Sequence, residues 1–154
     1  MSRIFTSADV GEVIATLTPR PIVAEDLVLY ANASGDMNPL HLDIEFAREA
    51  GFDNLVVHGM LGMAHMGRLL TYMFSPVSIK SFSARFTAVI LAGEQVCYRA
   101  TLLESDGDFY RLSLDAKTTA GTVVIKGDAI VDAHLAKAVP RLEPGPAPSI
   151  KDTE

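Results

Sequence analysis

Apolar residues recur at helical spacing in the first half of the chain. Residues 24–34 begin with acidic side chains, which suit the positive start of a helix, and then place apolar side chains on one side. Residues 44–50 can form one or two further helical turns, which Gly51 would stop. Residues 59–74 are apolar on nearly every face, so a helix there must be enclosed. The pattern predicts a short amphipathic helix, a helical turn and one buried helix.

The second half of the chain changes toward a period of two. Four segments rich in β-branched and aromatic residues predict consecutive strands at residues 77–90, 95–103, 109–118 and 123–133. Short stretches with glycine or aspartate separate them, which favours an antiparallel meander. A further strand is predicted near residues 13–17. We therefore expect an α+β fold, in which an antiparallel sheet wraps around the one buried helix.

Length and composition narrow the class of protein. The chain has 154 residues, 49% of them apolar, which is enough for one domain, predicted at residues 1–139. Four prolines and few large apolar residues predict a disordered or loosely attached tail at residues 140–154. A formal net charge of −6 argues against nucleic acid as the main partner. One cysteine, no signal-peptide pattern and no unbroken apolar span favour a cytoplasmic protein that does not enter a membrane.

One short segment carries the candidate chemistry. Residues 34–41 read Ser-Gly-Asp-Met-Asn-Pro-Leu-His, so a carboxylate, Asp36, and an imidazole, His41, flank Asn38-Pro39. Proline disfavours the helical conformation of the residue before it and has no N–H, so we expect a non-helical turn that folds Asp36 and His41 toward one point. An imidazole with an ordinary pKa of about 6.5 suits proton transfer near neutrality, and a carboxylate can orient it or bind the same water. We predict a joint acid/base pair, which Asn38 braces. Taken alone, such a pair is more often only an Asx turn and a loop histidine.

The surrounding residues identify a family resemblance. Tyr30, the eight residues 34–41 and Ala47 resemble the signature of the MaoC-like, (R)-specific enoyl-CoA hydratases and dehydratases. The fold of that family is the hot-dog, an antiparallel sheet around a central helix. The resemblance implies hydration of trans-2-enoyl thioesters to (R)-3-hydroxyacyl thioesters, or the reverse dehydration, without a cofactor. It also implies an acyl-CoA or acyl-carrier-protein thioester as substrate and a homodimer, although a heteromer with this chain as catalytic subunit stays open.

The resemblance continues beyond the motif. Residues 57–60, Val-His-Gly-Met, resemble the start of the family's central helix, and Arg85-Phe86 with Gly93 resembles a later strand and turn. The similarity therefore covers roughly residues 5–136. Two departures from the family pattern, at Ala33 and in the turn at residues 91–94, bear on the fit of the substrate rather than on the acid/base pair.

Hydration also needs a donor for the thioester oxygen. Gly59 offers an unencumbered backbone N–H at the positive end of the buried helix, and it is the candidate oxyanion hole. Asn38, His58, Met60 and Arg85 are the candidate substrate contacts. Plainer interpretations compete with these roles. His58 can cap the helix or be structural, a methionine at helical spacing is more often core, and a lone basic residue on a strand, including Lys80 or Arg99, is usually solvated.

Other kinds of site fit the sequence less well. His58 and His65 lie about 10 Å apart along a helix, and no other close cluster of metal ligands is expected, so no metal site is predicted. A hot-dog acyl-CoA thioesterase is the alternative enzyme, but it commonly carries a carboxylate on or near the central helix. There is neither Asp nor Glu between Asp53 and Glu94. The same gap disfavours the related dehydratases that pair a loop histidine with a helix glutamate. A non-catalytic subunit would have no reason to keep the Asp36 and His41 pair.

Overall fold

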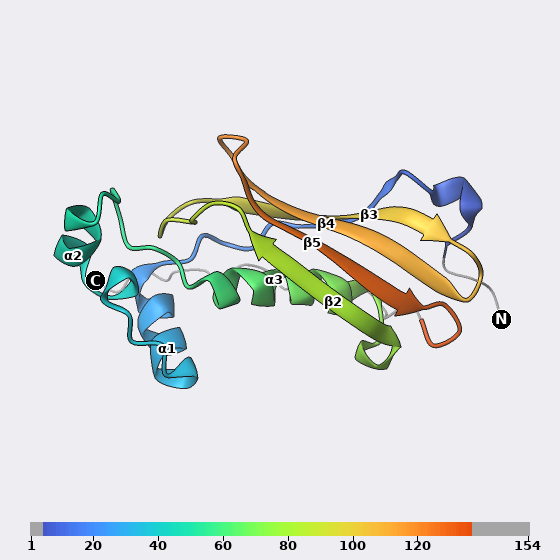
Figure 1. The fold of residues 1–154 in the computed structure, drawn as a ribbon, viewed down its shortest axis with the longest axis horizontal. Helices are drawn as coiled ribbons and strands as arrows, with labels where there is room; N and C mark the ends of the chain where they lie inside the picture. The colour runs from blue at the N-terminus through green and yellow to red at the C-terminus, as the bar shows by residue number, and fades with distance from the viewer. Residues whose placement is uncertain (1–4, 137–154) are drawn as a thin grey trace, which may run out of the picture.

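Five antiparallel strands curve along one side of a long helix (Figure 1). The structure is a computed structural model, and it describes residues 5–136. The strands pair in the order β1-β3-β4-β5-β2, so β1 and β2 are the two edges of the sheet. Their bounds are β1 Val13–Leu17, β2 Ile79–Phe86, β3 Val96–Ser105, β4 Phe109–Thr118 and β5 Val123–Asp132. The tail predicted at residues 140–154 and the predicted domain end at 139 lie outside the described residues.

Three helices complete the fold: α1 Ala24–Ser34, α2 Ile44–Glu49 and α3 Gly59–Met73. Helix α3 lies against the sheet, whereas α1 and α2 gather at the end of the molecule where α3 begins (Figure 1). Within residues 5–136, none of these helices is long and apolar enough to cross a membrane.

The core lies between α3 and the inner face of the sheet. Met66, Leu69 and Leu70 of α3 are almost completely buried, at a spacing of three and four residues that places them on one face. Burying side chains of this size stabilises the fold by about 1.5 to 3 kcal/mol each. Gly62 permits the close approach of helix and sheet, because a Cβ there would stand 3.1 Å from the Cδ1 atom of Ile125.

The strands alternate as a half-buried sheet requires. On β3 and β4 every second side chain faces the core, and the inner aromatic ring of Tyr98 is 1% exposed. Burial raises the pKa of the Tyr98 hydroxyl to about 12. The outer face is polar, and there Arg99 of β3 donates to both carboxylate oxygens of Asp115 on β4. The expected α+β hot-dog architecture is therefore confirmed.

Two local predictions were wrong. The strand predicted at residues 77–90 is shorter, because Pro76 begins a 3₁₀ turn before β2 and the chain leaves the ladder after Phe86. The N–H groups of Thr87 and Ala88 both donate to the Val124 carbonyl of β5, and the Val57 N–H donates to the Ile90 carbonyl at 2.8 Å, so the chain has reached the segment before α3 by Ile90. The motif turn is also not wholly non-helical. Residues Pro39–His41 form a 3₁₀ turn, whereas residues 35–38 before it lie outside any helix.

Candidate active site

The loop that carries the candidate acid/base pair begins where α1 ends. Gly35 has a φ of +78°, in the left-handed region that favours glycine, and its N–H donates to the Ala31 carbonyl at 2.8 Å. The next N–H, that of Asp36, donates to the Ser34 Oγ at 3.2 Å. The chain therefore turns sharply away from the α1 axis at Gly35, directly before the candidate catalytic carboxylate.

Side chains of the loop hold its bend. The Asn38 N–H donates to Asp36 Oδ1 at 3.3 Å, and Asn38 Oδ1 accepts from the Leu40 N–H at 3.0 Å. The second bond caps the 3₁₀ turn that Pro39 begins, where the missing proline N–H is not needed. Asn38 therefore has the bracing contacts expected of it. The turn returns the chain so that His41 faces Asp36.

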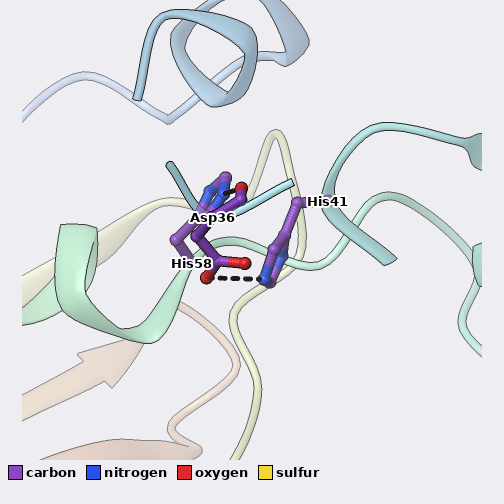
Figure 2. Close-up of side chains that lie close together, drawn as sticks. All are labelled: Asp36, His41 and His58. Atoms are coloured by element: carbon purple, nitrogen blue, oxygen red, sulfur yellow. Dashed lines mark hydrogen bonds and ion pairs between the residues drawn. The ribbon is translucent and has the colours of Figure 1, made fainter. Parts of the chain in front are cut away.

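The imidazole of His41 is fixed in one orientation. Its Nδ1 lies 2.6 Å from the Val56 carbonyl, and because a carbonyl can only accept, Nδ1 carries the proton of the neutral ring. Its Nε2 is then an acceptor, and it faces Asp36 Oδ2 at 3.8 Å (Figure 2). This separation is too long for a direct hydrogen bond and suits a water that bonds to both groups. The His41 side chain is 11% exposed and that of Asp36 is 53% exposed.

A second histidine lies against this pair. The ring of His58, the N-cap residue of α3, stacks on that of His41 with centroids 3.8 Å apart and planes 28° apart (Figure 2). His58 Nε2 donates to the Asp36 backbone carbonyl at 3.1 Å, and the residue is 1% exposed. The side chain makes no capping bond to the helix, so the capping role considered for it was wrong. Sequence reasoning missed the stack, although a histidine between apolar residues and a helix start could have signalled a buried ring.

The expectation that no close cluster of metal ligands exists was also wrong. One ligand atom from each of Asp36, His41 and His58 lies within 4.8 Å of the others. Imidazole lone pairs lie in the planes of their rings, and a zinc ion sits about 2.0 Å from each nitrogen. Two nearly parallel rings stacked 3.8 Å apart do not aim both lone pairs at one point. The arrangement suits proton transfer beside a stacked ring better than coordination of an ion.

The imidazole of His41 forms part of the wall of an apolar cavity. The cavity has a volume of about 160 Å³ and opens between the segment before α3 and the end of β2. Its walls are formed by His41, Val56, Val57, Gly59, Phe86, Ala88, Val89, Ile90 and Ile125. Gly59 is the first residue of α3, where a backbone N–H has no partner within the helix. A Cβ on Gly59 would stand 3.4 Å from the Phe86 ring, so this wall is already closely packed.

The other candidate contacts lie outside the cavity wall. Met60 is 57% exposed, and His58 is buried behind the His41 ring. Arg85 precedes Phe86 on β2, so its side chain leaves the opposite face of the strand. Of the methionines, Met66 is completely buried, as a core residue should be, whereas the core interpretation was wrong for Met60. The substrate-contact roles of Asn38, His58, Met60 and Arg85 stay predictions.

A hot-dog sheet around a helix, with an Asp/His pair beside an apolar cavity, defines the class of protein. The model of the MaoC like domain matches residues 6–123, and the chain belongs to this family. It is 33% identical over 129 residues to the mitochondrial 3-hydroxyacyl-[acyl-carrier-protein] dehydratase of Arabidopsis thaliana, a match that covers 80% of this chain and 76% of that protein. It is 30% identical over 127 residues to an (R)-specific enoyl-CoA hydratase of Rhodospirillum rubrum, covering 80% and 88%.

Solved structures agree with this assignment. The (R)-hydratase of A. caviae involved in PHA biosynthesis superposes with a TM-score of 0.70 at 27% identity, over 83% of this chain and 98% of that one. Some curated relatives are longer, and the matches cover only 26% and 39% of two enoyl-CoA hydratases. The predicted family is confirmed, and so is the reaction class, because the relatives are named hydratases and dehydratases of acyl thioesters.

Proposed function

We propose that this protein adds water to trans-2-enoyl thioesters to give (R)-3-hydroxyacyl thioesters, or catalyses the reverse dehydration, with Asp36 and His41 as the acid/base pair. The observation that carries the proposal is the 3.8 Å gap between His41 Nε2 and Asp36 Oδ2 at the edge of an apolar cavity. Helix α3 contains neither Asp nor Glu, so the acidic group must come from the loop.

The two side chains can hold one water in position to react. A water in the gap donates one hydrogen to His41 Nε2 and one to Asp36 Oδ2, which leaves an oxygen lone pair free to attack the β-carbon of the substrate. As the new C–O bond forms, one member of the pair takes a proton from the water, and the pair returns a proton to the α-carbon. Atoms and charge balance over the cycle, because the enoyl thioester gains H and OH and the pair regains its starting state.

The thioester oxygen gains negative charge as water adds. The Gly59 N–H, at the positive end of α3, is the donor that we assign to this oxygen. A backbone donor of this kind contributes about 2.7 to 4 kcal/mol to a transition state. His41 and Gly59 share the wall of the same cavity, so the β-carbon and the thioester oxygen of one substrate can reach both groups. The apolar walls, among them Val57 and Ile125, would then enclose the acyl chain.

The basic side chains of the sheet indicate which residue could bind the phosphate of the thioester's carrier. Lys80 pairs with Asp132 at 3.3 Å, and Arg99 is engaged by Asp115, so neither is available for a phosphate. Arg85 has no ion pair within residues 5–136 and stands directly opposite Lys126 in the register of β2 and β5. We assign Arg85 as the phosphate contact of an acyl-CoA or acyl-carrier-protein thioester. The expected cytoplasmic location stays a prediction of the sequence.

A homodimer is proposed from the exposed edge of the sheet. Strand β2 pairs only with β5 among the described strands, so its other side presents free backbone groups. Exposed apolar side chains lie beside it, with Val77 71% and Phe86 47% exposed. A partner along this edge would cover them and lengthen the wall of the cavity. Sedimentation at micromolar concentration should give twice the mass of 16.6 kDa, and a monomer that gains activity only with a second gene product would favour the heteromer instead.

The proposed reaction is tested with purified protein and a panel from crotonyl-CoA to long-chain enoyl-CoAs, each also offered on an acyl-carrier protein. We expect hydration by the wild type and a decrease in kcat of about 10² to 10⁴ for Asp36→Asn and for His41→Gln, because each removes one member of the acid/base pair. Both variants should retain the circular dichroism of the wild type. A wild type that only releases free thiol from saturated acyl-CoA, with both variants equally active, would make the protein a thioesterase.

A further inference from the structure

We propose that His58 is a positioning residue, which holds the loop of Asp36 and His41 in register with the first turn of α3. The inference rests on the proposed function, because it concerns the geometry of that acid/base pair. His58 neither lines the cavity nor caps the helix, yet it contacts both members of the pair.

The loop docks on the segment before α3 through three hydrogen bonds. The Val56 N–H donates to the Leu40 carbonyl at 3.0 Å, and the Val56 carbonyl accepts from His41 Nδ1 at 2.6 Å. The third bond runs from His58 Nε2 to the Asp36 carbonyl at 3.1 Å. The first two bonds fix the His41 end of the loop. Only the third reaches the Asp36 end, so His58 sets the separation between the carboxylate and the imidazole.

The ring of His58 is also a flat wall for His41. The stacked rings leave His41 no freedom to swing toward α3, so its Nε2 stays directed at Asp36. On its other side His58 meets the ring of Tyr30, with centroids 4.9 Å apart. One residue of α1 and one of the loop thus enclose the His58 ring, and the next residue in the chain is Gly59, the assigned oxyanion donor. His58 therefore connects the donor, the base and the acid.

An unpartnered nitrogen supports a positional rather than a space-filling role. His58 Nδ1 is buried and has no hydrogen-bond partner within residues 5–136. The Nε2 of the ring must carry a proton to bond the Asp36 carbonyl, so Nδ1 is the bare nitrogen of a neutral ring. An apolar ring would fill this space without leaving a polar atom unsatisfied. The Nε2–H and the flat face of the His58 ring both act on the pair, and these two contacts offset the cost of the unsatisfied Nδ1.

Three variants separate the contributions of His58. His58→Phe keeps an aromatic ring but removes the donor, whereas His58→Gln places an amide N–H the same number of bonds from Cβ as Nε2 and removes the ring. Leu69→Ala is the matched control, because it weakens the packing of α3 without touching the loop. We expect His58→Phe to lower kcat for crotonyl-CoA about 10²-fold with KM within twofold, since a misplacement near 1 Å has an effect of that order. His58→Gln should recover at least tenfold of this loss, and Leu69→Ala should lower Tm but not kcat.

A second measurement does not depend on turnover. The His41 N–H bonds within the loop, and the Val56 N–H donates to the loop. Hydrogen exchange of these two amides, measured relative to the amides of α3, should be at least tenfold faster in His58→Phe than in the wild type. A wild type that hydrates nothing would refute the proposed reaction, and the exchange would still decide the positioning role. If His58→Phe keeps the kcat of the wild type, or if its exchange increases equally in the loop and in α3, His58 is a packing residue and the inference is wrong.

Discussion

The turn at Gly35 gives a prediction whose size follows from backbone geometry. Gly35 has a φ of +78°, and a Cβ added there meets no atom within 4 Å, so Gly35→Ala introduces conformational strain without a clash. An alanine in the left-handed region costs roughly 1 to 2 kcal/mol, and the lower entropy of the unfolded alanine chain offsets about 0.4 to 1 kcal/mol of this. The net loss in the free energy of unfolding is therefore about 1 kcal/mol, which lowers Tm by about 2 to 4 °C for a chain of this size.

Two further variants make this prediction specific. Gly35→Asn should lose less stability than Gly35→Ala, because asparagine enters the left-handed region more readily. Gly67→Ala should have the opposite sign. Gly67 lies inside α3, and a Cβ there would make an ordinary contact of 3.6 Å with the Phe82 ring of β2. Alanine in a helix interior is favoured by up to about 1 kcal/mol over glycine. Urea unfolding followed by circular dichroism measures all three, with unchanged m values. A Gly35→Ala protein as stable as the wild type, or a shift of the same sign at both glycines, would show that the left-handed φ of Gly35 does not determine the effect.

Three other predictions concern the site and the charges near it. Gly59→Val should lower kcat/KM for crotonyl-CoA by about 10²-fold or more, because the added methyls meet the Phe86 ring and displace the proposed oxyanion donor. Gly59→Ala should be milder in the same assay. Burial lowers the pKa of His65. The free energy of unfolding should therefore keep its full value above the ordinary pKa of 6.5 and decrease as the pH falls toward the lower pKa of the folded state. Urea titrations at pH 7.5 and pH 5 should show that His65→Gln lacks this part of the decrease. The hydrogen bond from Arg20 lowers the pKa of Asp26, so Arg20→Ala should be less stable than the wild type at pH 7. In melts at lower pH the difference should begin to decrease near the ordinary value of 3.8 and disappear only below the lowered pKa of the folded state.

Much of the fold could be predicted because periodicity reports burial directly. The wholly apolar stretch after His58 became the enclosed helix α3, and the alternating segments became β3, β4 and β5. The strand before them was predicted too long, because the regular ladder of β2 ends at Phe86 and Ile90, four residues further on, pairs with the segment before α3. Local composition does not specify which distant segment a residue will pair with, so the end of this strand was set by tertiary contacts.

Contacts of the site that lie within one short segment could be predicted from the sequence, whereas contacts between two distant segments could not. The motif placed Asp36 and His41 together because one short loop carries both, and their 3.8 Å approach confirms that part of the prediction. The stacking of His58 on His41 depends on the docking of residues separated by 17 positions, which no local pattern encodes. For the same reason the sequence did not reveal that Phe86, rather than Arg85, faces the cavity.

We infer that one loop pair both activates the water and returns the proton, so the hydroxyl oxygen and the new hydrogen must reach the substrate from one face. Hydration of crotonyl-CoA in D₂O, followed by NMR and chiral analysis of the product, determines the face to which each is added. We predict (R)-3-hydroxybutyryl-CoA with a single deuterium at C2, added to the same face as the hydroxyl, and a rate at least 10²-fold lower in Asp36→Asn and His41→Gln. Deuterium on the opposite face, a mixture of both faces, or unchanged rates in the two variants would contradict the claim.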